Sequence, residues 1–82
     1  MTLFVGLRPA ESDARAAFVT PKALGSAVVR NRLRRRMREI YRRHLAALLE
    51  DRQVIWSARS AAAGMDFQDL KQVMVALGTK SV

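Results

Sequence analysis

Cysteine is absent from this sequence of 82 residues, and histidine occurs only once. Disulfides, thiolate metal sites and a cysteine nucleophile are therefore excluded, and a histidine-rich zinc site is not expected. No uncharged stretch approaches the ~20 apolar residues that a bilayer-spanning helix requires. Residues 1–9 lack the basic start and long apolar core of a signal peptide. We expect one soluble domain, residues 1–82, located in the cytoplasm.

Acidic residues are scarce where basic residues are most frequent. The chain carries a formal net charge of +8, yet residues 1–20 and 46–82 are each neutral overall. The whole excess lies between Lys22 and Arg43, where nine basic side chains accompany a single acid, Glu39. Most of these are arginines, whose guanidinium groups suit bidentate phosphate contacts. This distribution predicts a surface that binds a polyanion, with nucleic acid the first candidate and an anionic membrane the second.

Three short apolar segments predict strands. Thr2–Arg8 and Arg15–Thr20 are each followed by a proline, and the short polar loop between them favours an antiparallel hairpin. Arg52–Arg59 is apolar enough for a central position in the sheet. Ser60–Gly64 is rich in small residues, which predicts a loop.

Two further segments have the periodicity of amphipathic helices. The first begins at Ser26, its expected N-cap, and runs to about Asp51. The second begins after Asp66 and ends at Gly78. The order β-β-α-β-α predicts an α+β fold, a two-layer α/β sandwich in which two helices cover a small sheet. The apolar face of the first helix is expected to contain Val29, Leu33, Met37, Ile40, His44 and Ala47.

The ionisable residues form no recognisable catalytic set. His44 falls on the apolar face of the long helix, where a buried neutral imidazole is expected. Asp66 and Asp69 are explained as residues that cap the first turn of the second helix. The sequence has no glycine-rich phosphate loop and no carboxylates at metal-binding spacing. We therefore predict that the chain carries neither catalytic residues nor a metal site.

The remaining face of the long helix is basic. Many charge runs are merely solvated surfaces, but helical arginines usually have acidic partners at i+4, and Glu39 is the single acid among eight arginines. A basic-zipper interpretation fails because the leucines after residue 44 cannot sustain several heptads. A membrane-surface helix would need the apolar face that must cover the sheet. These arguments favour nucleic-acid binding, and chemistry alone leaves both RNA and DNA open.

The segment Lys22–Glu39, KALGSAVVRNRLRRRMRE, closely resembles the signature of the bacterial ribonuclease P protein component. The family pattern has a Lys and a Gly, then Ala-Val and Arg-Asn-Arg, followed by a basic pair and Arg-Glu on one helix. The resemblance extends to the strand ending at Ala58-Arg59 and to the helix beginning near Phe67, so it covers essentially the whole chain. The matching positions are Gly25, Ala27, Val28, Arg30, Asn31, Arg32, Arg34, Arg35, Arg38 and Glu39.

Two features depart from the family pattern. Family members usually begin with a helix and a connecting segment before the first strand, whereas this sequence starts at that strand. Pro21 and Ala23 replace a Ser and the second Lys of the pair that precedes Gly25. Both departures fall in regions that the family uses near the 5′ leader of precursor tRNA.

The resemblance implies the protein subunit of a ribonucleoprotein endoribonuclease that removes the 5′ leader from precursor tRNA. In that family the RNA subunit hydrolyses the phosphodiester with Mg²⁺, so the protein itself needs no cofactor. The implied partners are ribonuclease P RNA, bound by a monomeric protein one to one, and precursor tRNA, with no membrane. The resemblance also implies a fold like domain 2 of ribosomal protein S5, with a left-handed β-α-β crossover, although ~98% of such crossovers are right-handed.

The same resemblance assigns the contacts. The basic helix is expected to bind the RNA subunit mainly through phosphates. Phe4 and Phe18 are expected to share one face of a hairpin and to stack on leader bases. The alternative function is a ribosomal or other structured-RNA-binding protein without a role in processing. The expected RNA-binding residues are Lys22, Arg30, Asn31, Arg32, Arg34, Arg35, Arg38 and Arg42.

Overall fold

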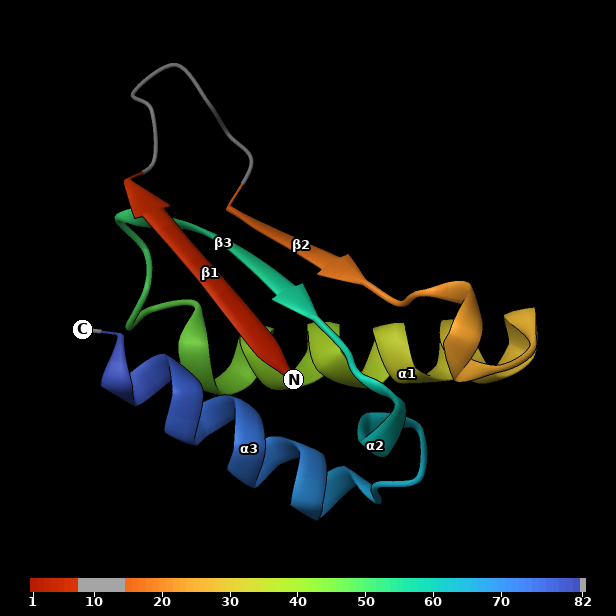
Figure 1. Ribbon diagram of the computed structural model, residues 1–82. Helices are drawn as coiled ribbons and strands as arrows, with labels where there is room; N and C mark the ends of the chain where they lie inside the picture. The colour runs from red at the N-terminus through yellow and green to blue at the C-terminus, as the bar shows by residue number, and fades with distance from the viewer. Residues whose placement is uncertain (8–14, 82) are drawn as a thin grey trace.

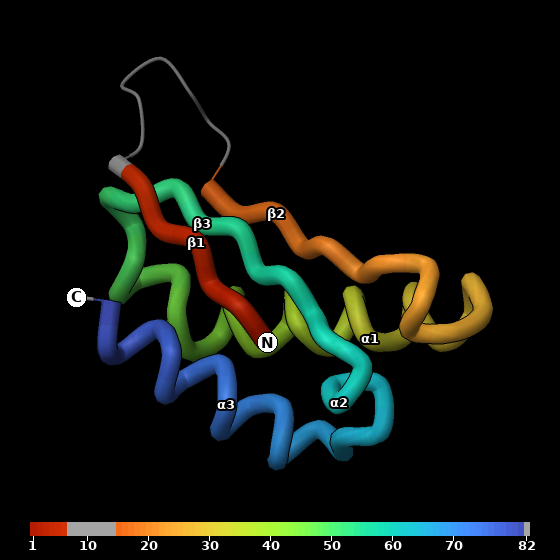
Figure 2. Tube along the Cα trace, viewed as in Figure 1, coloured from red at the N-terminus to blue at the C-terminus, as the bar shows by residue number. Residues whose placement is uncertain are grey.

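The computed structural model describes residues 1–7 and 15–81. Three strands form one layer, and two long helices lie together against one side of it (Figure 1; Figure 2). The expected two-layer α+β architecture is therefore confirmed. The elements are β1 (Thr2–Leu7), β2 (Ala16–Val19), the 3-10 turn η1 (Lys22–Leu24), α1 (Ala27–Ile40), the π-helical turn η2 (Tyr41–Leu45), β3 (Arg52–Ser57), α2 (Ser60–Ala63) and α3 (Phe67–Lys80).

The sheet has the order β1-β3-β2, which confirms the predicted central position of β3. β1 pairs with β3 in antiparallel orientation, and β2 pairs with β3 in parallel orientation. The predicted hairpin of the first two strands is therefore wrong, because they flank β3 instead of pairing with each other. β3 carries the fully buried Val54 and Trp56, and a central position hides both of its edges. The polar loop expected between β1 and β2 lies at residues 8–14, outside the described residues.

β2, α1 and β3 form a crossover between parallel neighbours. In Figure 1, α1 passes behind the sheet while the chain moves from β2 to β3, and this arrangement is left-handed. Most strand-helix-strand crossovers have the opposite hand. Only the resemblance predicted this hand, since neither residue pattern nor composition encodes it.

Beyond the C-terminal end of α1, the positions that are buried no longer follow the period of an α-helix. The chain continues as the π-helical turn Tyr41–Leu45, in which the Ala46 N–H donates to the Tyr41 carbonyl over 2.8 Å. A π turn closes on the fifth residue and so shifts all later side chains around the axis. The predicted burial of His44 and Ala47 is therefore wrong: both are exposed, and Leu45 is buried instead. Residues 46–51 form turns, whereas further helix was expected there.

The last third of the chain also differs from expectation in two places. Ser60–Ala63, expected to be a loop, forms the short helix α2. α3 begins as predicted, since the Asp66 carboxylate accepts a hydrogen bond from the Asp69 N–H at 2.8 Å. Gly78 does not end α3 but lies buried within it, where a Cβ atom would be 2.5 Å from Cδ2 of Leu45. The absence of a side chain at Gly78 lets α3 approach the π-helical turn closely.

Candidate nucleic-acid interface

The predicted RNA-binding residues lie mainly along α1, on a surface that we call the basic ridge. α1 begins at the N-cap Ser26, whose hydroxyl accepts a hydrogen bond from the Val29 N–H at 3.3 Å, and its first turn has no acidic residue. Lys22 lies just before it in η1, and Arg42 lies just after it in η2. Within residues 1–7 and 15–81, none of the ridge arginines forms an ion pair. The basic ridge consists of Arg30, Asn31, Arg32, Arg34, Arg35 and Arg38.

Arg34 ties the ridge to the end of β2. One terminal nitrogen of its guanidinium donates to the Thr20 hydroxyl at 2.7 Å, and the other donates to Oδ1 of Asn31 at 3.3 Å. Thr20 is buried, so this contact fixes the Arg34 side chain and orients the Asn31 amide. Thr20 was not among the predicted site residues, because an uncharged residue beside a proline gives no sequence signal for such a role.

Arg38 covers an aromatic pair between α1 and β2. Its guanidinium carbon lies 5.7 Å from the centroid of the Phe18 ring. The Phe18 ring in turn meets Tyr41 edge-on, with centroids 5.9 Å apart and an interplanar angle of 73°. Both geometries are attractive, because a cation favours the face of an aromatic ring and aromatic pairs favour edge-to-face contact. Phe18 therefore supports a ridge arginine.

Phe4 and Phe18 lie on opposite faces of the sheet, which corrects the expectation that they share one. Phe4 pairs with Ile55 and Phe18 pairs with Trp56, and consecutive residues of β3 point to opposite sides. The face with Trp56 packs on the helices, where Phe18 is half-buried. Phe4 points the other way and is 57% exposed. The error followed from the predicted hairpin, which would have put the two rings side by side.

The sheet face that carries Phe4 is not covered by any described element. Both long helices lie on the other side of the sheet (Figure 1). Phe4, Ile55 and Val19 are exposed apolar residues, one on each strand, and the register places all three on this outer face. At the same end of the sheet, Nε of Arg59 donates to the Thr2 hydroxyl at 3.1 Å. The interface thus combines a cationic helix with an open, apolar sheet surface.

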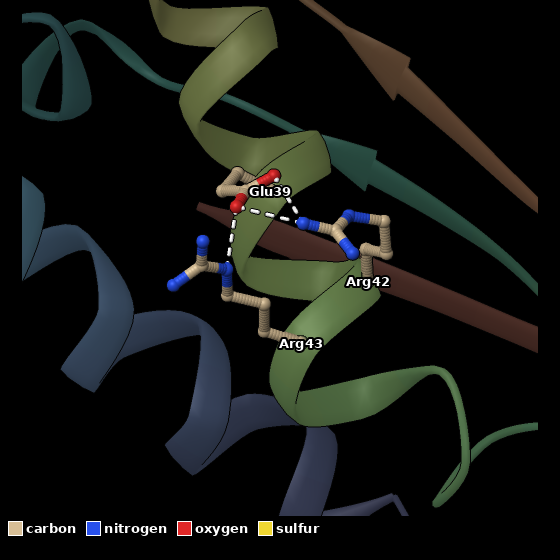
Figure 3. A network of polar contacts seen from close by, with 3 residues as sticks. All are labelled: Glu39, Arg42 and Arg43. Carbon is tan, nitrogen blue, oxygen red and sulfur yellow. Dashed lines mark hydrogen bonds and ion pairs between the residues drawn. The ribbon is translucent and has the colours of Figure 1, made fainter.

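Glu39 neutralises part of the basic surface beyond the ridge. Its carboxylate accepts two hydrogen bonds from Arg42, at 2.9 and 3.1 Å, and forms an ion pair with Nε of Arg43 (Figure 3). The hydrogen bond from Arg42, with the positive charges of Arg42 and Arg43, holds the pKa of the Glu39 carboxyl below its ordinary value of 4.5. Arg42, predicted to bind RNA, therefore shares its charge with a carboxylate, whereas the ridge arginines do not.

The lowered pKa of Glu39 makes a small part of the stability pH-dependent. A depressed carboxylate pKa stabilises the fold above the ordinary value, and this contribution is lost as the pH falls through the lowered pKa. Glu39→Gln should therefore show a smaller fall in melting temperature than the unmodified chain between about pH 5 and about pH 3. Thermal unfolding followed by circular dichroism checks this. Identical pH profiles would show that the three-residue network does not persist in solution.

Two of the basic residues beside the ridge point elsewhere. Arg36 donates from Nη1 to the Met65 carbonyl at 3.5 Å, toward the segment between α2 and α3. Arg43 forms an ion pair with Glu39.

In the described part of the chain, no three His, Cys, Asp or Glu side chains gather where they could hold a metal ion. Nor does any helix within those residues have the length and apolar character needed to cross a membrane.

Comparisons with known proteins agree on one family. The model of the family Ribonuclease P matches residues 1–81. The ribonuclease P protein component of Salinispora tropica is 40% identical over 65 residues, covering 79% of this chain and 48% of that protein. The corresponding protein of a Nocardioides species is 34% identical over 83 residues, covering 95% of this chain and 70% of that protein. The chain thus spans about half the length of the first relative.

Solved structures give the same result at the level of the fold. The structure of the Staphylococcus aureus RNase P protein superimposes with a TM-score of 0.72 at 26% identity, covering 95% of this chain and 70% of that one. A mutant of the S. aureus protein with defective mRNA degradation activity superimposes with a TM-score of 0.77 at 28% identity, covering 95% and 64%. The similarity therefore extends over nearly the whole fold, since both superpositions cover 95% of this chain.

Proposed function

This chain belongs to the ribonuclease P protein family, and from that premise we propose that it acts as the protein subunit of ribonuclease P. In this role it assists the endonucleolytic removal of the 5′ leader from precursor tRNA. The observation that supports the proposal most directly is the basic ridge, whose arginines have no ion-pair partner among the described residues. Uncompensated guanidinium groups along one helix suit a phosphate backbone.

Ribonuclease P RNA is the proposed partner of the basic ridge. Guanidinium groups neutralise phosphates along its backbone, while Asn31 can hydrogen-bond to sugars or base edges. Mg²⁺ bound to the RNA supplies the hydrolytic chemistry in this proposal. The protein contributes binding and positioning, as a monomer with one copy per RNA, in the cytoplasm.

The uncovered sheet face is the proposed site of the precursor-tRNA leader. Single-stranded RNA binds to surfaces where exposed aromatic rings stack on bases beside positive charge. Phe4 offers such a ring, with Ile55 beside it on β3. Phe18 is half-buried under Arg38 and so supports the ridge from below instead of stacking on a base.

Reconstitution tests the proposed function. The protein alone should cleave no precursor tRNA, and its addition to ribonuclease P RNA should raise cleavage at low Mg²⁺ concentration. Tagged protein should also recover ribonuclease P RNA from cells. Recovery of ribosomal particles instead, with no effect on cleavage, would point to a structured-RNA-binding protein without a processing role. Cleavage by the purified protein without any RNA subunit would contradict the proposed division of labour.

Phe4→Ala should weaken the binding of precursor tRNA about tenfold while leaving mature tRNA unaffected, since stacking contributes ~1–3 kcal/mol per base. The melting temperature should change little, because the Phe4 ring is mostly exposed. Val19→Ala is the matched control, as Val19 is exposed on the same face but has no aromatic ring. A large fall in melting temperature with unchanged leader discrimination would show that Phe4 is a structural residue.

A further inference from the structure

A shallow hollow lies on the surface of α1, among residues of the basic ridge. It has a volume of ≈ 310 Å³ and is lined by Val28, Asn31, Arg32 and Arg35. These positions follow the spacing i, i+3, i+4 and i+7, so they form one stripe along α1. Val28 is 66% exposed, which leaves an apolar side chain open to solvent between cationic neighbours. The volume is at the lower limit for pockets that hold small ligands.

The polar groups that line the hollow are hydrogen-bond donors. Arg32 and Arg35 can only donate, and neither has an ion-pair or hydrogen-bond partner within residues 1–7 and 15–81. The Asn31 amide has one acceptor, Oδ1, and this atom already accepts from Arg34. Because Arg34 is itself held by Thr20, the amide is oriented with its NH₂ group free to donate. The hollow therefore combines an apolar contact with three donor side chains.

We propose that this hollow binds an unstacked nucleobase of RNA and prefers guanine or uracil. The base would rest on Val28 and between the guanidinium groups, which stack on base planes. Guanine presents two neighbouring acceptors, O6 and N7, and uracil presents carbonyl oxygens, so each can accept from the Asn31 amide and the arginines. Adenine and cytosine present an amino donor at the position where guanine has O6 and uracil has O4, so at that position they would face further donors. The inference rests on the proposed RNA-binding function, and it specifies which bases this surface would recognise.

A phosphate group is the competing occupant, because it also accepts hydrogen bonds from all three polar side chains. It would gain nothing from Val28, however, since an anion does not benefit from contact with an apolar side chain. A phosphate would also be insensitive to base identity. The role of Val28 and the dependence on the base therefore separate the two occupants.

The test uses hairpin RNAs that differ only in one bulged nucleotide, which is G, U, A, C or absent. Dissociation constants are measured by fluorescence anisotropy at one fixed salt concentration. The hairpins with a bulged G or U should bind about tenfold more tightly than the hairpin without a bulge. Val28→Ser should remove most of this advantage without changing the affinity for the bulge-free hairpin. Leu48→Ser, at an apolar residue that is 41% exposed outside the hollow, should change neither value.

Equal affinities for all five hairpins, unaffected by Val28→Ser, would overturn the inference and leave a phosphate contact only. Steep salt dependence would persist in that case, so the proposed RNA-binding function would stand. If instead no hairpin bound with salt-dependent affinity, both the inference and the proposed function would be contradicted. The comparison among bulged nucleotides uses the unmodified protein, so it decides the question even if a variant folds poorly.

Discussion

Raising the monovalent salt concentration from about 50 mM to about 200 mM should weaken the binding of ribonuclease P RNA by roughly 250- to 1,000-fold. Each phosphate that an arginine neutralises releases condensed counterions, and added salt opposes that release. With about five or six such contacts, the logarithm of the binding constant should fall against the logarithm of the salt concentration with a slope of roughly −4 to −5. Filter binding across this range measures the slope directly.

Single arginine substitutions on α1 show which residues contribute to that slope. Arg34→Ala and Arg38→Ala should each flatten it by nearly one unit, because neither side chain forms an ion pair within the described residues. Both substitutions should also cause some loss of local order, since Arg34 donates to Thr20 and Arg38 lies over the Phe18 ring.

Arg36→Ala is the matched control for these variants. Its guanidinium donates to the Met65 carbonyl on the far side of α1 and should contribute less to RNA binding. Equal changes in slope for Arg34, Arg38 and Arg36 would show that binding is diffuse and is not confined to the basic ridge.

Trp56→Ala should remove a large part of the stability of the fold. Trp56 is fully buried in the middle strand, with Leu3 and Phe18 as its register partners on either side. Truncation of a buried Trp or Phe typically costs ~3–5 kcal/mol. A domain of this length is expected to be stable by only about 4–12 kcal/mol. Urea denaturation should therefore show a midpoint of unfolding at a much lower urea concentration than that of the unmodified chain.

Ile55→Ala provides the comparison for Trp56→Ala. Ile55 is the preceding residue of the same strand, but it is 42% exposed on the uncovered face. Its truncation removes much less buried surface and should cost about 1 kcal/mol or less. Similar losses for the two variants would mean that the outer face of the sheet is also covered in solution.

Local patterns predicted the helix starts and the central strand correctly. Ser26 and Asp66 are side chains that cap helices through contacts three residues away, and such contacts depend on sequence neighbours alone. The burial of Val54 and Trp56 in β3 was predictable in the same way, because both lie in an apolar segment of the sequence. The unpaired arginines of the ridge also followed from the sequence, because few acids are near them in the chain.

Non-local features were not predictable in the same way. A short connection favours pairing of the first two strands with each other. β3 pairs with both of them instead and brings more apolar surface to the centre of the sheet. The π-helical turn breaks the 3.6-residue period on which the predicted burial of His44 depended. The predicted position of Phe18 on the same sheet face as Phe4 depended on the predicted hairpin. It was wrong because the first two strands do not pair with each other.

The strand order also sets the timing of folding during synthesis. β1 has its register partners some fifty residues later, with Thr2 opposite Ser57, and β2 depends on the same late strand. At ~5–20 residues per second, a ribosome makes β3 about 3–10 s after β1. Throughout that interval the two edge strands have no partner from β3, whereas the arginine-rich helix α1 is completed before β3 is made. The nascent chain therefore presents its cationic helix to ribosomal RNA before its sheet can form.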